Sequence, residues 1–259
     1  MLPPDWENAG RYGRVVSGVG MENWEFREWQ TALGALDPGA AGLVGLAAAE
    51  RISGCLGDER FLRHGPRAAE AARELLRECW SVAGFPDADG DGGGDGDGSA
   101  STRIRDVADE LAGHVADYQT LSMTEVFRSY VPLAGDEDED PGEEAPDLEE
   151  FLEEAEPEGA VMMHLDALAA MEEAAAACAG GPWDGALRCL QVTAMAADRH
   201  DPRLPGPGAE VRRQREDLLS VREADGAQLR QVAARLRTRA QADAAGWRRA
   251  TERLGLLHD

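Results

Sequence analysis

Residues 37–52 read DPGAAGLVGLAAAERI and combine a helix start with a helical apolar pattern. Asp37 is a typical N-cap residue, and Pro38 suits the first turn of a helix, where backbone N–H groups lack helical partners in any case. We therefore expect a helix that ends near Leu56, with one apolar stripe facing the core. The stripe consists of Val44, Ala48, Ile52 and Cys55.

Helical spacing continues on both sides of this stretch. Upstream, a helix expected over residues 23–36 carries Phe26, Trp29, Leu33 and Leu36. Downstream, the expected helices span residues 66–83, 101–121, 122–131, 159–179 and 182–200, followed by one or two long helices in a proline-free run from 209 onward. The helix over 122–131 is predicted from a capping box, Ser122-x-x-Glu125. In the last run, Gly226 and Gly246 weaken the pattern without breaking it.

The composition indicates the same fold class. Aromatic residues make up 5% of the chain, and Ala and Leu fill most positions of a 43% hydrophobic content. These two residues favour close-packed helices, whereas sheets are richer in β-branched and aromatic side chains. We expect a single all-α domain of about seven helices, arranged as a bundle or an orthogonal array, with a long C-terminal helix.

Three segments lack a helical pattern. Residues 1–21 are expected to form a disordered tail, and residues 22–259 the helical domain. Met21 stands directly before the first helical pattern and is an alternative start of the protein. Within the domain, the Asp- and Gly-rich segment 85–100 is expected to be a flexible loop, and the segment 135–158 a disordered acidic insertion.

The charged residues exclude several partners and reactions. A net charge of -24 argues against nucleic acid and anionic membranes as partners, because both would repel the chain. All 26 basic residues are arginines, so reactions that need a lysine, such as those of P-loops and Schiff bases, are excluded. Residues 136–158 hold 14 acidic residues and no basic one, whereas residues 203–259 hold 12 arginines against 8 acidic residues. We expect the acidic insertion to be solvated. The alternatives are mimicry of nucleic acid or binding to a basic partner, and contact with the arginine-rich C-terminal helix.

The cysteines and the apolar segments indicate a compartment. Cys55, Cys79, Cys178 and Cys189 show no CxxC or zinc-ligand spacing, so we expect buried free thiols in a reducing cytoplasm. The longest run of small and apolar residues, 39–49, is shorter than the roughly 20 residues that cross a bilayer. The first residues contain acids and prolines where a signal peptide needs an apolar core.

One short motif suggests calcium. Residues 87–92, Asp-Ala-Asp-Gly-Asp-Gly, match the first half of an EF-hand loop, in which alternate carboxylates surround the ion. The second half fails, because Gly94 stands at the eighth position and Gly98 at the twelfth, where a bidentate Glu is required. We expect a flexible acidic spacer here, and a calcium-responsive regulator stays a minor alternative.

No catalytic, cofactor-binding or metal motif stands out, but three residues are candidates for a site assembled by the fold. Glu50 borders an apolar stripe, and a partly buried carboxylate there serves either as an acid or base or as a structural ion-pair partner, with Arg51 beside it. His164 and Asp166 lie two positions apart and therefore point to different faces of their helix. We expect structural roles for Glu50 and His164. The other histidines, which join no cluster, are His64, His114, His200 and His258.

Several features occur in an order that a known family shares. They are the Trp29 helix, LAAAER at 46–51, the helix ending at Trp80, HLDA at 164–167, the Pro182 helix with Thr193, and EDLLSVREADGAQLRQVAARLR at 216–237. Over about residues 24–240 the chain resembles the YjaG-like family of helical proteins of unknown function. The resemblance implies an all-α bacterial cytoplasmic protein, places Glu50-Arg51 and Asp166-Ala167 at recurrent family positions, and supplies no reaction, ligand or catalytic residue. The tail, the Asp/Gly loop, the acidic insertion and the C-terminal extension depart from the family.

The sequence favours a protein-interaction or accessory module without catalysis. A protein partner or self-association through the long C-terminal helix is expected, and an uncovered apolar stripe on that helix would mark the surface. The main alternative is an enzyme or small-molecule binder, for which two of Glu50, His164 and Asp166 should meet in a closed pocket.

Overall fold

The all-α prediction is confirmed by a computed structural model, which describes residues 26–83, 96–130, 148, 159–181, 183–200 and 207–254. Within these ranges there is no strand, and nine α-helices and one 3₁₀ helix form a bundle. The elements are α1 (Phe26–Gly34), α2 (Pro38–Ile52), η2 (Ser53–Gly57), α3 (Glu59–His64), α4 (Pro66–Val82), α5 (Gly96–Tyr130), α7 (Gly159–Cys178), α8 (Asp184–His200), α9 (Pro207–Arg222) and α10 (Gly226–Arg253).

The central helix, α2, begins as its sequence predicts. The Asp37 carboxylate accepts a hydrogen bond from the Ala40 N–H at 2.9 Å. Among residues 40–52 only Glu50 is not buried, so the expectation of a single apolar stripe was too narrow. Small side chains make this possible, because neighbouring helices approach closely: a Cβ on Gly45 would lie 3.0 Å from the Cα of Ala186.

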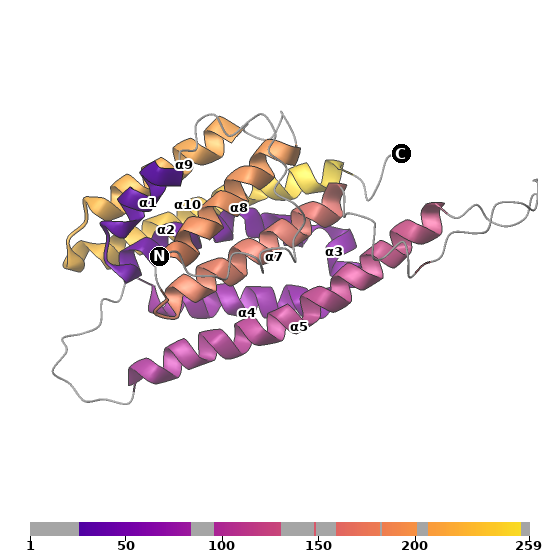
Figure 1. The fold of residues 1–259 in the computed structure, drawn as a ribbon, viewed down its shortest axis with the longest axis horizontal. Helices are drawn as coiled ribbons and strands as arrows, with labels where there is room; N and C mark the ends of the chain where they lie inside the picture. Colours follow the sequence, from indigo (N-terminus) through magenta and orange to yellow (C-terminus); the bar gives the residue numbers. More distant parts are fainter. Residues whose placement is uncertain are drawn as a thin grey trace, which may run out of the picture.

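The other helices surround α2 and α7. α8, α9 and α10 pack on one side of α2, whereas α4 and α5 lie on the side of α7 that faces away from them. α5 contacts α4, α7 and α3, and Figure 1 shows it along one edge of the molecule, with its C-terminal end reaching beyond the other helices. Among the described helices, none is both long and apolar enough to cross a membrane.

Several helix boundaries differ from the predictions. α2 ends at Ile52 and not near Leu56, because the chain tightens into η2 there, and α3 was not predicted. Ser122 does not cap a new helix, because α5 continues unbroken through it to Tyr130. A capping box signals a start only where the preceding residues leave the helix, and here the apolar stripe of α5 continues past the motif. By contrast, the C-terminal run is interrupted before Gly226: the Asp225 carboxylate accepts from the Gln228 N–H at 2.9 Å and begins α10.

Several predicted segments lie outside the described residues. These are the tail 1–21, most of the acidic insertion 135–158, and residues 85–95 of the predicted loop 85–100. The last part of that loop was wrong, since α5 already begins at Gly96. Extending an existing helix costs less than starting one, so a few poor helix formers join the helix that follows them.

Candidate functional site

Glu50 does not form the ion pair with its neighbour Arg51 that the sequence suggested. Its carboxylate instead accepts a hydrogen bond from the Trp80 indole N–H at 2.7 Å, and the guanidinium of Arg237 lies 5.7 Å from the centre of the Trp80 ring. These contacts join α2, α4 and α10. Glu50 thus joins α2 to α4 through a hydrogen bond and not through the ion pair that we expected.

Arg51 is the centre of a buried charge network that the sequence did not reveal. Its guanidinium is 2.7 Å from a carboxylate oxygen of Glu210 and 2.6 Å from one of Asp217, and all three residues are at most 5% exposed. Burial acts to lower the pKa of Arg51, but the two carboxylates outweigh it and raise that pKa. Arg239 binds the other oxygen of Asp217, and Gln214 donates to Glu210 at 3.2 Å. The network therefore ties α2 to α9 and α10.

His164 lies in a second buried cluster. Its Nδ1 is 2.5 Å from the Tyr118 hydroxyl, and its Nε2 is 3.4 Å from a carboxylate oxygen of Asp58, while Phe61 packs against both rings. Burial lowers the pKa of His164, although Asp58 acts to raise it, so the imidazole is neutral at pH 7. A neutral ring with its proton on Nε2 accepts from Tyr118 and donates toward Asp58.

The cluster is closed to solvent. His164 is 0% exposed, Tyr118 1% and Asp58 3%, so no substrate reaches them in this conformation. Asp166 lies two residues further along α7, and its charge acts on the Cys55 thiol, which burial holds at a pKa of about 12. Glu50 contacts Trp80, whereas His164 contacts Tyr118 and Asp58 inside this closed cluster, so these two sequence candidates have different partners.

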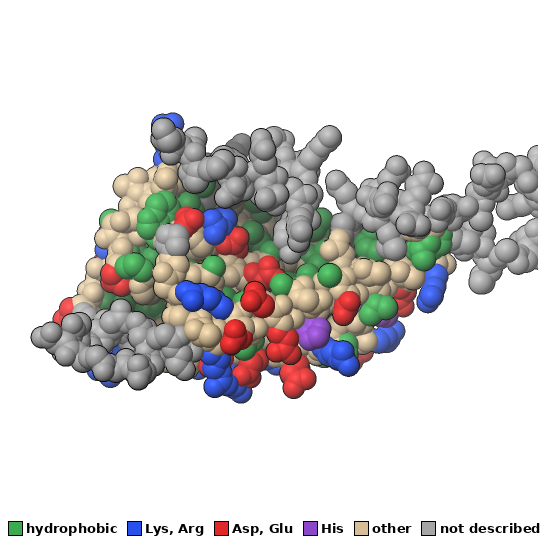
Figure 2. All heavy atoms as spheres, turned by 60° about the horizontal axis from the view of Figure 1, so that its bottom comes forward, with side chains coloured by type: hydrophobic (Ala, Val, Ile, Leu, Met, Phe, Trp, Pro, Cys, Tyr) green, Lys and Arg blue, Asp and Glu red, His purple; other side chains and the backbone are tan. Residues whose placement is uncertain are grey.

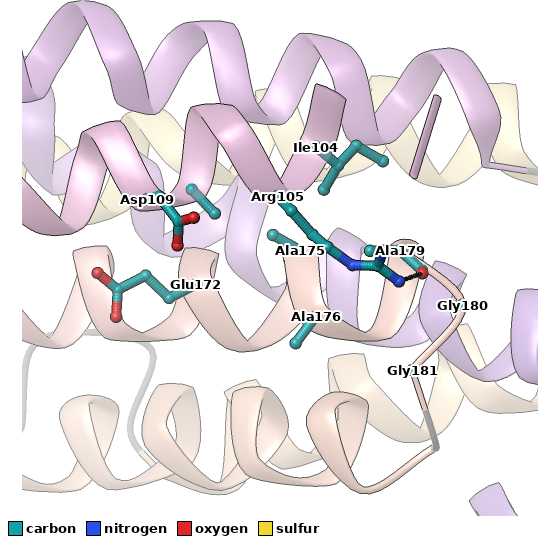
Figure 3. Close-up of a pocket in the computed structure, with 10 residues that line it drawn as sticks. Ile104, Arg105, Asp109, Glu172, Ala175, Ala176, Ala179, Gly180 and Gly181 are labelled. Carbon is teal, nitrogen blue, oxygen red and sulfur yellow. Dashed lines mark hydrogen bonds between the residues drawn. The ribbon is translucent and has the colours of Figure 1, made fainter. Parts of the chain in front are cut away.

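A hollow of about 270 Å³ lies elsewhere, between α5 and the C-terminal half of α7. Figure 3 shows the carboxylates of Asp109 and Glu172 at one end of it and Arg105 reaching toward the other. Most of the other lining residues have small side chains, which leaves the space open. They comprise Ile104, Ala108, Ala175, Ala176, Ala179, Gly180 and Gly181.

The end of α7 shapes one side of the hollow. Gly180 adopts a φ of 80°, which favours glycine, and the Gly181 N–H donates back to the Ala176 carbonyl at 3.1 Å. The Ala179 carbonyl accepts a hydrogen bond from the Arg105 guanidinium at 3.1 Å. The glycine stop that the sequence predicted at 180–181 therefore also builds this wall.

The two carboxylates of the hollow lack partners among the residues that the structure describes. Within the described part of the chain, neither Asp109 nor Glu172 forms a hydrogen bond or an ion pair. Burial, and then the charge of Glu173, raises the pKa of Glu172 to about 7. Glu173 itself is engaged by Arg188 at 2.7 Å. Glu172 is therefore only partly ionised near pH 7, and a bound cation would favour its charged form.

Sequence reasoning missed this hollow for a simple reason. Asp109 and Glu172 are far apart along the chain, and each lies in an ordinary helical pattern without a recognisable motif. An acidic residue at such a position usually points into solvent. Only the packing of α5 on α7 places both carboxylates at one opening.

The metal hypotheses find no support in the described residues. In these parts of the chain, no three His, Cys, Asp or Glu side chains gather as metal ligands. The Nε2 atom of His64 is 2.7 Å from a carboxylate oxygen of Glu125, and that of His114 is 3.8 Å from one of Glu110, so each histidine has a single acidic neighbour here. Of the four cysteines, all of which were expected to be buried, Cys178 is partly exposed. The calcium motif at 87–92 falls outside the described residues, so the calcium-responsive regulator stays a prediction that a calcium-dependent, chelator-reversible thermal shift would test.

Comparisons with known proteins identify no relative. No protein-family model, no curated protein and no solved structure matches the chain. The resemblance to the YjaG-like family therefore stays a prediction from the residues quoted above. The geometry of the chain itself is the basis for the proposals below.

Proposed function

We propose that this protein is a non-catalytic interaction module whose partner places a basic side chain in the hollow between α5 and α7. The observation that carries the proposal is the pair of carboxylates, Asp109 and Glu172, which share one opening without a cationic partner among the described residues. A guanidinium or ammonium group would supply the missing charge. Its aliphatic stem would pack against the alanines of the hollow.

The surroundings of the hollow add a longer-range attraction. Asp106, Glu110 and Asp117 are exposed on α5, close to Asp109 along the helix. Figure 2 turns this side forward and shows acidic side chains gathered in the middle of the face, with arginines around them. Such a field increases the rate at which a basic partner arrives, while the two carboxylates of the hollow position one of its side chains.

The C-terminal helix is less suited to the role that the sequence suggested for it. The apolar side chains of its stripe are buried against the rest of the described structure: Leu229, Val232, Leu236, Ala240 and Trp247. A helix whose stripe is covered stabilises its own fold. We therefore assign the interaction to the α5 side of the bundle.

A small-molecule binder is the second candidate, because the same hollow is large enough for a small amine. About 270 Å³ lies just below the usual size of ligand sites, and a carboxyl with a pKa of about 7 is also suited to proton transfer. Among the described residues that line the hollow there is no Ser, Cys or His that could act as a nucleophile. This candidate predicts that a free amine binds as tightly as an arginine within a peptide.

The test is a titration followed by amide chemical shifts in about 0.15 M salt, where surface attraction is screened beyond about 8 Å. The probes are a neutral peptide with a single arginine, the same peptide with citrulline in place of arginine, and free agmatine. We expect the arginine peptide to shift signals from α5 and the end of α7, and the citrulline peptide to leave them unchanged.

Matched variants locate the binding. Glu172→Gln and Asp109→Asn should each lower the affinity for the arginine peptide by about tenfold, equivalent to roughly 1.4 kcal/mol. Glu110→Gln removes the same charge from the adjacent, exposed position and should change the affinity less than twofold. Equal losses in all three variants, or equal binding of the citrulline peptide, would show diffuse attraction and overturn the proposal. Equal affinity for agmatine and the peptide would favour the small-molecule candidate.

A further inference from the structure

The outer face of α10 carries arginines that the bundle itself does not use. This helix contains seven arginines against two acidic residues. Arg239 and Arg248 have carboxylate partners on α9 and α10. By contrast, Arg249 and Arg253 are exposed and form no hydrogen bond or ion pair with the described residues. The apolar stripe of α10 is covered, but the end of its opposite face is therefore cationic and open.

The spacing of these arginines matches that of acidic residues beside the hollow. Arg249 and Arg253 are one helical turn apart, so they point the same way at a separation of about 6 Å along the axis. On α5, the exposed Asp106 precedes Asp109 by about one turn, and Asp109 borders the hollow. Two basic side chains can thus meet two acidic ones when the helices lie side by side.

The two helices lie on different sides of the bundle. α5 packs on α3, α4 and α7, whereas α10 packs mainly on α2, η2 and α9, and Figure 1 shows α7 between them. Neither exposed face is crowded, because Gly113 on α5 and Gly246 on α10 have open space where a Cβ would lie. The end of α10 from one molecule can therefore approach the hollow of another molecule.

We propose that the partner of the hollow is a second copy of this chain, whose Arg249 enters between α5 and α7. There its guanidinium meets Asp109 and Glu172, and Arg253 one turn away meets Asp106. A guanidinium presents several N–H donors in a plane, so it can serve both carboxylates of the hollow. Self-association of this kind rests on the proposed function, because the same two carboxylates receive the arginine.

Such a contact repeats from copy to copy. A molecule whose hollow is filled still offers the arginines of its own α10, so the contact joins unlike surfaces head to tail. The net charge of -24 opposes close approach of two copies when little salt is present. At about 0.15 M salt, charges beyond about 8 Å are screened, while pairs in contact are affected less. We therefore expect association to be strongest at intermediate salt.

The experiment measures the mean mass of the full chain by light scattering in about 0.15 M salt. The protein concentration rises from about 10 μM to about 500 μM, the range in which weak contacts form. We expect the mass to increase with concentration beyond that of a dimer. The neutral peptide with a single arginine, added in excess, should return the protein to a monomer because it occupies the hollow.

Two double variants test whether unlike surfaces meet. Arg249→Gln with Arg253→Gln, and Asp109→Asn with Glu172→Gln, should each lower the association constant by about tenfold or more. A mixture of the two should form a complex of one copy each that grows no further. In that complex, the intact hollow of the first variant binds the intact arginines of the second. Recovery on mixing also shows that both variants are folded.

The matched control is Arg63→Gln with Arg67→Gln. It removes the same charge from exposed arginines of α3 and α4 that have no partner among the described residues, and it should associate like the original protein. An equal loss of association in this control, assembly that stops at a dimer, or no complex in the mixture would each overturn the self-association.

The peptide titration separates this result from the proposed function. A chain that binds the arginine peptide in its hollow but stays monomeric at every concentration would overturn the self-association and leave the proposed function in place. A chain whose hollow does not bind the arginine peptide would overturn both.

Discussion

Two pairs of carboxylates on opposite sides of the bundle have opposite environments. Glu210 and Asp217, on α9, are almost inaccessible to solvent and share the guanidinium of Arg51. Asp109 and Glu172, on α5 and α7, border an open hollow and pair with no cation in the described residues. A carboxylate that holds a fold together is desolvated and needs its partner at all times, whereas one that is left unpaired at a solvent-filled opening is available for an external cation.

The largest effect should come from removing the cation of the buried network. Arg51→Ala leaves Glu210 and Asp217 buried beside a lost charge, and breaking such a pair costs about 3–5 kcal/mol in the free energy of unfolding. Denaturant unfolding at pH 7.5 measures this loss. The double variant Arg51→Met with Glu210→Gln should recover part of it, because one orphaned charge is removed.

The matched control is Arg213→Ala. Arg213 pairs with Glu216 and Asp243 on the surface of α9 and α10, and its side chain is 34% exposed. Exposed pairs contribute roughly 0–1 kcal/mol. Similar costs for Arg51→Ala and Arg213→Ala would contradict the claim that burial makes the Arg51 network more important for stability than an exposed ion pair.

An intermediate effect is expected from the buried His164 cluster, which contains a neutral imidazole where the Arg51 network contains a charged group. His164→Gln should cost about 1–3 kcal/mol, because the Tyr118 hydroxyl and Asp58 lose their buried partner. In this variant the free energy of unfolding should also lose the pH dependence that His164 causes. The folded pKa of His164 is below its ordinary 6.5, so the unfolded chain takes up the proton first and stability falls as the pH drops through 6.5.

The free energy of unfolding is measured at several pH values between 5.0 and 7.5, with and without His164→Gln. Both proteins carry Glu172→Gln, because Glu172 contributes a pH dependence of the opposite sign. His114→Gln, at a partly exposed histidine beside Glu110, should retain the slope. A slope that is unchanged in His164→Gln would show that another group titrates.

The smallest effect is expected at the hollow. The folded pKa of Glu172 is about 7, above the ordinary 4.5, so its stabilising contribution is complete below pH 4.5 and is lost as the pH rises through 7. Glu172→Gln should therefore stabilise the protein at pH 8 by about 1 kcal/mol, a value reduced for the partial exposure of the side chain.

The gain should shrink toward zero near pH 4.5, and Glu110→Gln should show no such pH dependence. A loss of stability in Glu172→Gln at pH 8 would indicate that Glu172 has a structural partner, as Glu210 does. The same variant thus serves both the stability and the binding comparison.

Local patterns predicted much of this fold. The Asp37 cap, the start of α4 at Pro66 and the glycine stop of α7 at Gly180 depend on neighbours within one turn, and each was predicted correctly. The break before Gly226 was missed, although Asp225 is a good N-cap residue, because the apolar spacing continues across it. At Ser122 the opposite error occurred, because a helix start was predicted where α5 continues. The backbone N–H groups there already have partners inside the helix, so the cap motif has none to satisfy.

By itself the sequence determined the helical class, most helix boundaries and the exclusion of lysine-dependent chemistry, because these depend on residue types and short spacings. The tertiary structure alone decided which polar groups meet. It placed Arg51 between two carboxylates of α9, His164 between Tyr118 and Asp58, and Asp109 beside Glu172 at a common opening. The energy of a charged or reactive side chain depends on burial and on neighbours a few ångströms away, and in a helical bundle those neighbours come from other helices.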